Sequence, residues 1–142
     1  MTKTTTTRAP ARGDRTRPAV YVAASEFDRL ANLAETFHGP GARLLAQELD
    51  RAVVVEARRP RRGFVRLHST VSYLDHASGQ ERTVALTLPS EADIDQGRLS
   101  VTAPAGAALI GLSVGDVFSW RGDDGRVHEL TVLRVTDPDP AG

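Results

Sequence analysis

The stretch that decides the fold runs from Asp93 to Trp120 and reads DIDQGRLSVTAPAGAALIGLSVGDVFSW. Its first part predicts a turn at residues 95–97, where a glycine can adopt positive φ. Residues 98–102 alternate and are rich in β-formers, which predicts a strand. Pro104 ends that strand, because proline has no backbone N–H to donate to a ladder.

The middle of the stretch predicts a short helix between two strands. Residues 105–110 are small and helix-prone, and Gly111 stands where a helix commonly ends. Small side chains let such a helix lie close to a sheet, with Leu109 and Ile110 as buried anchors worth roughly 1.5–3 kcal/mol each. A second strand is predicted at residues 117–120. On residue types alone, this pattern favours a packed corner of the core over a site.

Composition limits the classes of protein to consider. The chain has 142 residues, which is one ordinary domain, and 40% hydrophobic residues with 5% aromatics predict an aliphatic core. Without cysteine there is no disulfide or thiolate metal site. No apolar run approaches the ~20 residues of a membrane helix, and no signal peptide is visible, so we expect a cytoplasmic protein with no membrane partner. Eighteen basic and eighteen acidic residues argue against a dedicated DNA-binding protein.

The sequence before this stretch predicts a helical hairpin. Apolar residues recur at helical spacing over residues 25–37, after an imperfect capping box that begins at Ser25. Residues 38–41 (HGPG) break the helix, and a second helix is predicted over residues 42–51. So short a connection makes the two helices antiparallel neighbours.

Strands dominate the remainder. They are predicted at residues 52–56, 69–75, 80–88 and 127–135, with residues 64–67 as a short crossing segment. Hairpins join most of them, so we expect an α+β fold in which an antiparallel sheet carries one packed helix. The arginine-rich run at residues 58–62 is interpreted as a solvated loop, with a phosphate-binding or acidic-partner patch as the alternative. The predicted divisions of the chain are a disordered basic leader at 1–18, a helical hairpin at 19–51, a C-terminal domain at 52–136 and an acidic, proline-rich tail at 137–142.

Residues 100–116, SVTAPAGAALIGLSVGD, resemble the C-terminal signature of the bacterial Gre-type transcription factors. The following VFSW, with Trp120, is similar to one branch of that family, the Rnk-like regulators of nucleoside diphosphate kinase. The resemblance covers roughly residues 48–135. It implies an FKBP-like domain behind a short helical hairpin, with RNA polymerase as the partner.

The sequence contains no complete phosphate-loop, metal-binding or nucleophile motif. Gly106 and Gly111 have the spacing of a phosphate loop, but the lysine that would neutralise the phosphates is missing. The four histidines are not spaced as metal ligands. His68 and Ser69 are neighbours on an extended segment, so their side chains point to opposite faces. We therefore expect no catalytic residue, no metal and no cofactor.

The hairpin distinguishes the branches of the family. Cleavage-stimulating Gre factors, as the resemblance implies, insert a long coiled coil into the polymerase secondary channel, where acidic residues at its tip help to hold Mg²⁺. Here the arm is only about 15–20 Å long at 1.5 Å per residue, and its tip, residues 35–41, has one carboxylate, Glu35. We therefore expect a non-enzymatic regulator that docks near the secondary channel and competes with Gre factors. The alternatives are a cleavage-stimulating factor and an FKBP-like prolyl isomerase, which would need a cluster of aromatic residues.

The candidate polymerase contacts lie in the central corner and at the hairpin tip. They are Ser100, Pro104, Gly106, Asp116, Phe37 and His38. Pro104 and Gly106 are expected to shape the backbone of the corner. For Asp116 we favour a role in capping its own turn over a contact with a basic surface. We expect a monomer that binds no specific nucleic-acid sequence.

Overall fold

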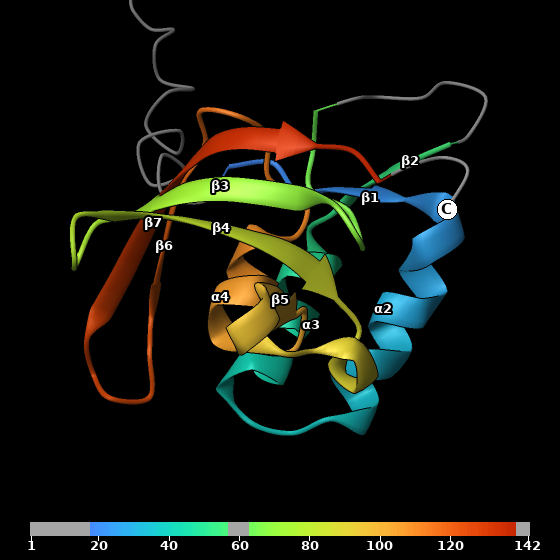
Figure 1. Ribbon diagram of the computed structural model, residues 1–142. Helices are drawn as coiled ribbons and strands as arrows, with labels where there is room; N and C mark the ends of the chain where they lie inside the picture. Colours follow the sequence, from blue (N-terminus) through green and yellow to red (C-terminus); the bar gives the residue numbers. More distant parts are fainter. Residues whose placement is uncertain (1–17, 57–62, 139–142) are drawn as a thin grey trace, which may run out of the picture.

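The computed structural model describes residues 18–56 and 63–138 (Figure 1). The helices are α2 (Ala24–Thr36), α3 (Pro40–Asp50) and α4 (Pro104–Leu109), with 3-10 turns η3 (Pro89–Glu91) and η4 (Ile94–Gln96). The strands are β1 (Tyr21–Ala23), β2 (Val53–Val55), β3 (Thr70–Asp75), β4 (Gln80–Thr87), β5 (Arg98–Ser100), β6 (Val117–Arg121) and β7 (Val127–Thr136). The predicted arginine-rich loop at 58–62, residues 1–17 of the leader and residues 139–142 of the tail lie outside the described residues. None of the helices in the described ranges has the length and apolar character needed to cross a membrane.

A five-stranded sheet in the order β5-β4-β3-β7-β6 forms the body of the fold. The pairs β3–β4, β3–β7 and β6–β7 are antiparallel, as expected. The predicted α+β class is therefore confirmed. At one edge, however, β5 pairs parallel to β4, with Ala85 opposite Arg98, so the sheet is mixed. The prediction of an antiparallel sheet fails there because the two 3-10 turns between these strands carry the chain back to the start of β5.

The predicted strand–helix–strand corner is confirmed with small changes of boundary. Figure 1 shows the sheet curling over α4, which begins at Pro104, in the first helical position that proline favours. Gly111 follows the helix with φ +84°, the left-handed conformation expected of a residue just past a helix end. Leu109 and Ile110 are 0% and 1% exposed, so both predicted anchors are buried. The strand before the helix ends at Ser100, two residues earlier than predicted.

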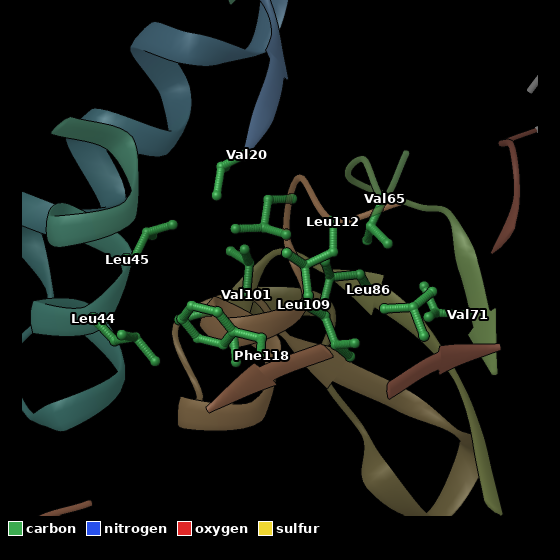
Figure 2. Close-up of a cluster of buried hydrophobic side chains, with 14 of the residues drawn as sticks. Val20, Leu44, Leu45, Val65, Val71, Leu86, Val101, Leu109, Leu112 and Phe118 are labelled. Carbon is green, nitrogen blue, oxygen red and sulfur yellow. The ribbon is translucent and has the colours of Figure 1, made fainter. Parts of the chain in front are cut away.

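The core lies between the sheet and the helices and is mostly aliphatic. Figure 2 shows side chains from α3, α4 and the sheet meeting in one cluster. The labelled members include Leu44 and Leu45 from α3, Leu109 from α4, and Leu86 and Phe118 from the sheet. The helical hairpin and the sheet therefore share a single core.

The helical hairpin is joined to the sheet domain by backbone contacts that were not predicted. β1 and β2 form a separate two-stranded parallel sheet, and the N–H of Tyr21 donates to the carbonyl of Gly111 at 3.0 Å. In α3, a Cβ on Gly41 would lie 1.9 Å from the carbonyl oxygen of Thr102. This close approach requires glycine and lets α3 pack beside α4.

Two predicted helix starts need correction. α2 begins at Ala24, and its N-cap, Ala23, makes no side-chain hydrogen bond, so the capping box expected at Ser25 does not form. The chain enters α2 directly from β1, and the strand pairing sets the start of the helix. α3 begins at Pro40, two residues before the predicted start, because proline suits the first turn of a helix.

Candidate functional site

Three of the predicted residues lie where β5 leads into α4. Ser100 ends β5, and its Oγ accepts a hydrogen bond from the Thr102 N–H at 3.0 Å. Gly106 is buried against Ser100, where a Cβ would lie 2.0 Å from the Ser100 carbonyl oxygen. Pro104 is exposed at the start of α4. Ser100 and Gly106 therefore hold the shape of the corner, and Pro104 presents it to solvent.

Asp116 lies at the other end of the segment, in the turn that leads from α4 to β6. Its Oδ2 accepts a hydrogen bond from the Ser113 N–H at 2.8 Å, and its own N–H donates to the Ser113 carbonyl at 3.0 Å. The expected turn-capping role is confirmed. Gly106 and Asp116 are thus placed by the architecture of the segment itself.

The remaining candidates, Phe37 and His38, form the connection between α2 and α3. Both are exposed, and the Phe37 side chain keeps 40% of its accessible surface. Glu35, two residues before Phe37, is exposed as well. Within residues 18–56 and 63–138 no three histidine, aspartate or glutamate side chains gather in a way that would hold a metal ion.

A groove of about 770 Å³ opens beside these candidates. One wall is α3, from Pro40 to Glu48, and the other is the β6–β7 hairpin. Pro104 and Ala105 at the start of α4 also line the groove. Pro40 lies two residues after His38, so the groove borders both the hairpin tip and the corner.

A row of aromatic rings lines the groove on the β6–β7 side. Phe118 and Trp120 have near-parallel rings with centroids 6.0 Å apart, and Trp120 and His128 are stacked at 5.3 Å. Trp120 pairs with His128 across the two strands, and Phe118 stands two residues earlier on the same face. The row leads from the buried Phe118 outward to the half-buried His128.

An ion pair crosses the mouth of the groove. Nη2 of Arg43 on α3 lies 3.0 and 3.1 Å from the two carboxylate oxygens of Asp123 in the β6–β7 loop. The two side chains are 60% and 66% exposed, so this pair contributes at most about 1 kcal/mol to stability. Another charged group can therefore replace Arg43 or Asp123 in this ion pair at small cost.

The neighbouring Asp124 is held in its ionised form. Its Oδ1 accepts a hydrogen bond from the Arg126 N–H at 2.9 Å, and His128 Nε2 lies 3.4 Å from the same oxygen. These contacts, the backbone hydrogen bond first, lower the pKa of Asp124 below its ordinary value of 3.8. The side chain of Asp124 thus stands in the loop next to that of Asp123.

This lowered pKa predicts a pH dependence of stability. A carboxyl group with a lower pKa in the folded state stabilises the protein above its ordinary pKa, and the stabilisation is lost as pH falls through the folded value. The Asp124→Asn variant is therefore expected to be less stable than the parent at pH 7, with the difference shrinking as pH falls through the lowered pKa of Asp124. Urea unfolding at a series of pH values measures this. A difference that stayed constant with pH would contradict the role of the charge.

Two other titratable groups have shifted pKa values outside the groove. His68 Nε2 lies 2.9 Å from Glu91 Oε1, and this hydrogen bond, with one from the Leu88 N–H, lowers the pKa of Glu91. Burial raises the pKa of Tyr73.

The neighbours His68 and Ser69 have separate partners, as predicted. Ser69 is buried, and its Oγ accepts a hydrogen bond from the Arg66 N–H at 2.9 Å, while the His68 ring contacts Glu91.

The groove itself was not predicted from the sequence. A partial signal was present, because Trp120 lies four residues before Asp124 and His128 lies three residues after Gly125, on the two strands of the predicted hairpin, where the structure pairs them. The contribution of α3 had no such signal, since Arg43 and Asp123 are 80 residues apart.

Comparisons with known proteins identify relatives for most of the chain. Residues 60–137 match the family described as transcription elongation factor, GreA/GreB, C-terminal. The chain is 33% identical over 130 residues to the regulator of nucleoside diphosphate kinase of Escherichia coli strain K12, covering 89% of this chain and 96% of the relative. It is 34% identical over 130 residues to the transcription elongation factor GreA of Rhodospirillum rubrum, covering 83% of each.

A solved structure supports the same relationship. The prokaryotic transcription elongation factor GreA/GreB from Nitrosomonas europaea superposes with a TM-score of 0.65 at 32% identity. The match covers 85% of this chain and all of that structure. It supports the expected FKBP-like domain preceded by helices.

Proposed function

Because the chain belongs to the GreA/GreB family of transcription elongation factors, we propose that it is a regulator that binds RNA polymerase and catalyses no reaction of its own. It would act in the cytoplasm, where the polymerase is found. The proposal rests on the family match. The geometry of the helical hairpin determines which branch of the family we propose.

We propose that the chain belongs to the Rnk-like branch. The identities to the nucleoside diphosphate kinase regulator and to GreA are nearly equal, so identity does not separate the branches. Coverage and shape favour the regulator, since the match spans 96% of its length against 83% of the GreA relative. The helices α2 and α3 have 13 and 11 residues, which gives an arm of about 20 Å.

An arm of this length is poorly suited to stimulating transcript cleavage. Most of α3 packs against α4 and the core, where its Leu44, Leu45 and Leu49 side chains are buried. Glu35 is the one carboxylate in the predicted tip, residues 35–41, and Mg²⁺ sites of this kind need several oxygen ligands close together. We infer that the arm points toward the secondary channel without supplying a metal ligand to the active centre.

The docking surface we propose runs from the hairpin tip to the start of α4. Phe37, His38, Pro40 and Pro104 are its exposed members, and Pro40 and Pro104 also line the groove. Ser100 and Gly106 would contribute indirectly, by fixing the backbone that presents Pro104, and Asp116 would contribute by fixing the turn between α4 and β6. An exposed aromatic next to exposed prolines is a reasonable centre for a protein interface.

A binding measurement with core RNA polymerase tests this surface. The double variant Phe37→Ala/Pro104→Glu is expected to bind at least about 30-fold more weakly than the parent, because it removes an apolar anchor and places a charge in the interface. Both positions are exposed, so the fold should be kept, which circular dichroism checks. Val53→Ala is the matched control, since Val53 is an exposed apolar residue on β2, outside the proposed surface. Equal binding by parent and double variant would refute this surface, and no binding by the parent would refute the function.

A further inference from the structure

The groove has an acidic end. Asp123 and Asp124 follow each other in the β6–β7 loop, with side chains 66% and 50% exposed. Because their carboxylates are adjacent and reachable from solvent, they form a site that favours a cation with several N–H donors.

The chain places a guanidinium at this end. Arg43 reaches across the mouth of the groove from α3 and contacts both carboxylate oxygens of Asp123. The geometry shows that a guanidinium fits between the two walls. Since the pair is exposed, another guanidinium can take its place at small cost.

The rest of the groove suits a stretch of polypeptide. Phe118, Trp120 and Leu44 supply an apolar floor, while the Trp120 indole N–H and the Gln47 amide are hydrogen-bond donors in the lining. A peptide in extended conformation has free backbone carbonyls to accept those bonds, whereas the carbonyls of a helix are used within the helix. A volume of about 770 Å³ holds a few residues at most.

We propose that this groove binds an extended segment of another protein through an arginine side chain. The incoming guanidinium would displace Arg43 and contact Asp123 and Asp124, with the flanking backbone lying along Trp120 and Gln47. Arg43 would then act as an internal competitor for the site. The groove shares Pro40 and Pro104 with the surface proposed for polymerase, but the arginine site at Asp123 and Asp124 lies outside that surface, and its test does not involve polymerase.

The test uses the full chain labelled with ¹⁵N and two capped heptapeptides, GAVRLAG and GAVELAG. Trp120 is the single tryptophan, so its indole N–H gives one cross-peak that reports on the groove. The arginine peptide is expected to shift this peak saturably and to bind at least about tenfold more tightly than the glutamate peptide, because only the guanidinium gains charge-assisted hydrogen bonds.

Variants distinguish this mechanism from general attraction of a basic peptide. Asp123→Asn/Asp124→Asn is expected to abolish the preference for arginine, and Arg43→Gln to tighten binding about threefold by removing the competitor. Arg134→Gln is the matched control, because Arg134 forms a similarly exposed pair with Glu81 away from the groove, and it should leave the affinity unchanged. Equal affinity for the two peptides, weaker binding by Arg43→Gln, or a preference for oligothymidylate over the arginine peptide would overturn the proposal.

Discussion

Replacing Gly106 with alanine is expected to lower the free energy of unfolding by about 3 kcal/mol. The new Cβ would lie 2.0 Å from the carbonyl oxygen of Ser100 and 2.9 Å from its carbonyl carbon. These are backbone atoms at the end of β5, where the chain turns into α4, so neither side can rotate away. The clash would push α4 out of its place under the sheet, where Leu109 is fully buried. Urea unfolding followed by Trp120 fluorescence measures the loss.

A second glycine provides the control for this prediction. A Cβ on Gly122 would also make contacts of 2.8 Å, but with the side chains of Asp124 and His128. Exposed side chains can move, so Gly122→Ala is expected to cost less than about 1 kcal/mol. Similar losses in both variants would show that the tight backbone approach at Gly106 does not determine the position of α4.

Replacing Glu48 with alanine is expected to destabilise the protein by about 2–3 kcal/mol. Glu48 is 1% exposed on α3, and its Oε1 accepts a hydrogen bond from Arg51 Nε at 2.8 Å. Arg51 in turn donates to the carbonyl of Pro18 at 2.6 Å, at the point where the chain enters β1. Removing the carboxylate therefore takes away a partner of Arg51 and loosens the contact between α3 and the entry to β1. Because the Arg51 side chain is 28% exposed, water can solvate its charge and so reduces the loss of stability.

The same substitution at an exposed position separates the charge pair from helix propensity. Glu35→Ala lies on α2, where the side chain is exposed, and is expected to change stability by less than about 0.5 kcal/mol. Thermal unfolding of both variants at neutral pH makes the comparison. If Glu48→Ala were as stable as Glu35→Ala, the buried carboxylate would have no structural role.

Local patterns predicted the elements of the fold well. The short helix after Pro104, the glycine that closes it at residue 111 and the hairpins of the sheet follow from spacing and turn chemistry within a few residues. Asp116 is similar, since its carboxylate bonds a backbone N–H three residues away. Such features depend on neighbours in sequence, which a pattern can reveal.

Pairings between distant segments were not predictable in the same way. The parallel pairing of β1 with β2 joins Tyr21 to Val53, and each strand has three residues, too few for a clear alternation. The contact between Gly41 and Thr102 depends on how closely two helices approach, and the sequence around Gly41 reads only as a helix breaker. The groove was not predictable for the same reason, because one of its walls comes from α3 and the other from a distant part of the sequence.

The architecture explains how a Gre-family body can work with a short arm. Because α3 shares the core with α4 and β1 is tied to Gly111, the hairpin and the sheet domain pack as one unit. The tip residues Phe37 and His38 therefore stand at the end of a short hairpin that packs on the sheet domain, rather than at the end of a long projecting coil. In the proposed function, this arrangement occupies the approach to the secondary channel without supplying catalytic carboxylates.

A transcript-cleavage assay on a backtracked RNA polymerase complex tests the central claim most directly. The assay compares the polymerase alone, the polymerase with a cleavage-stimulating Gre factor, and the latter with increasing amounts of this protein. We predict that the protein alone leaves the cleavage rate unchanged and that it reduces stimulation by the Gre factor in a concentration-dependent way. Stimulation of cleavage by the protein alone, or stimulation by the Gre factor that persists at saturating concentrations of this protein, would contradict the account.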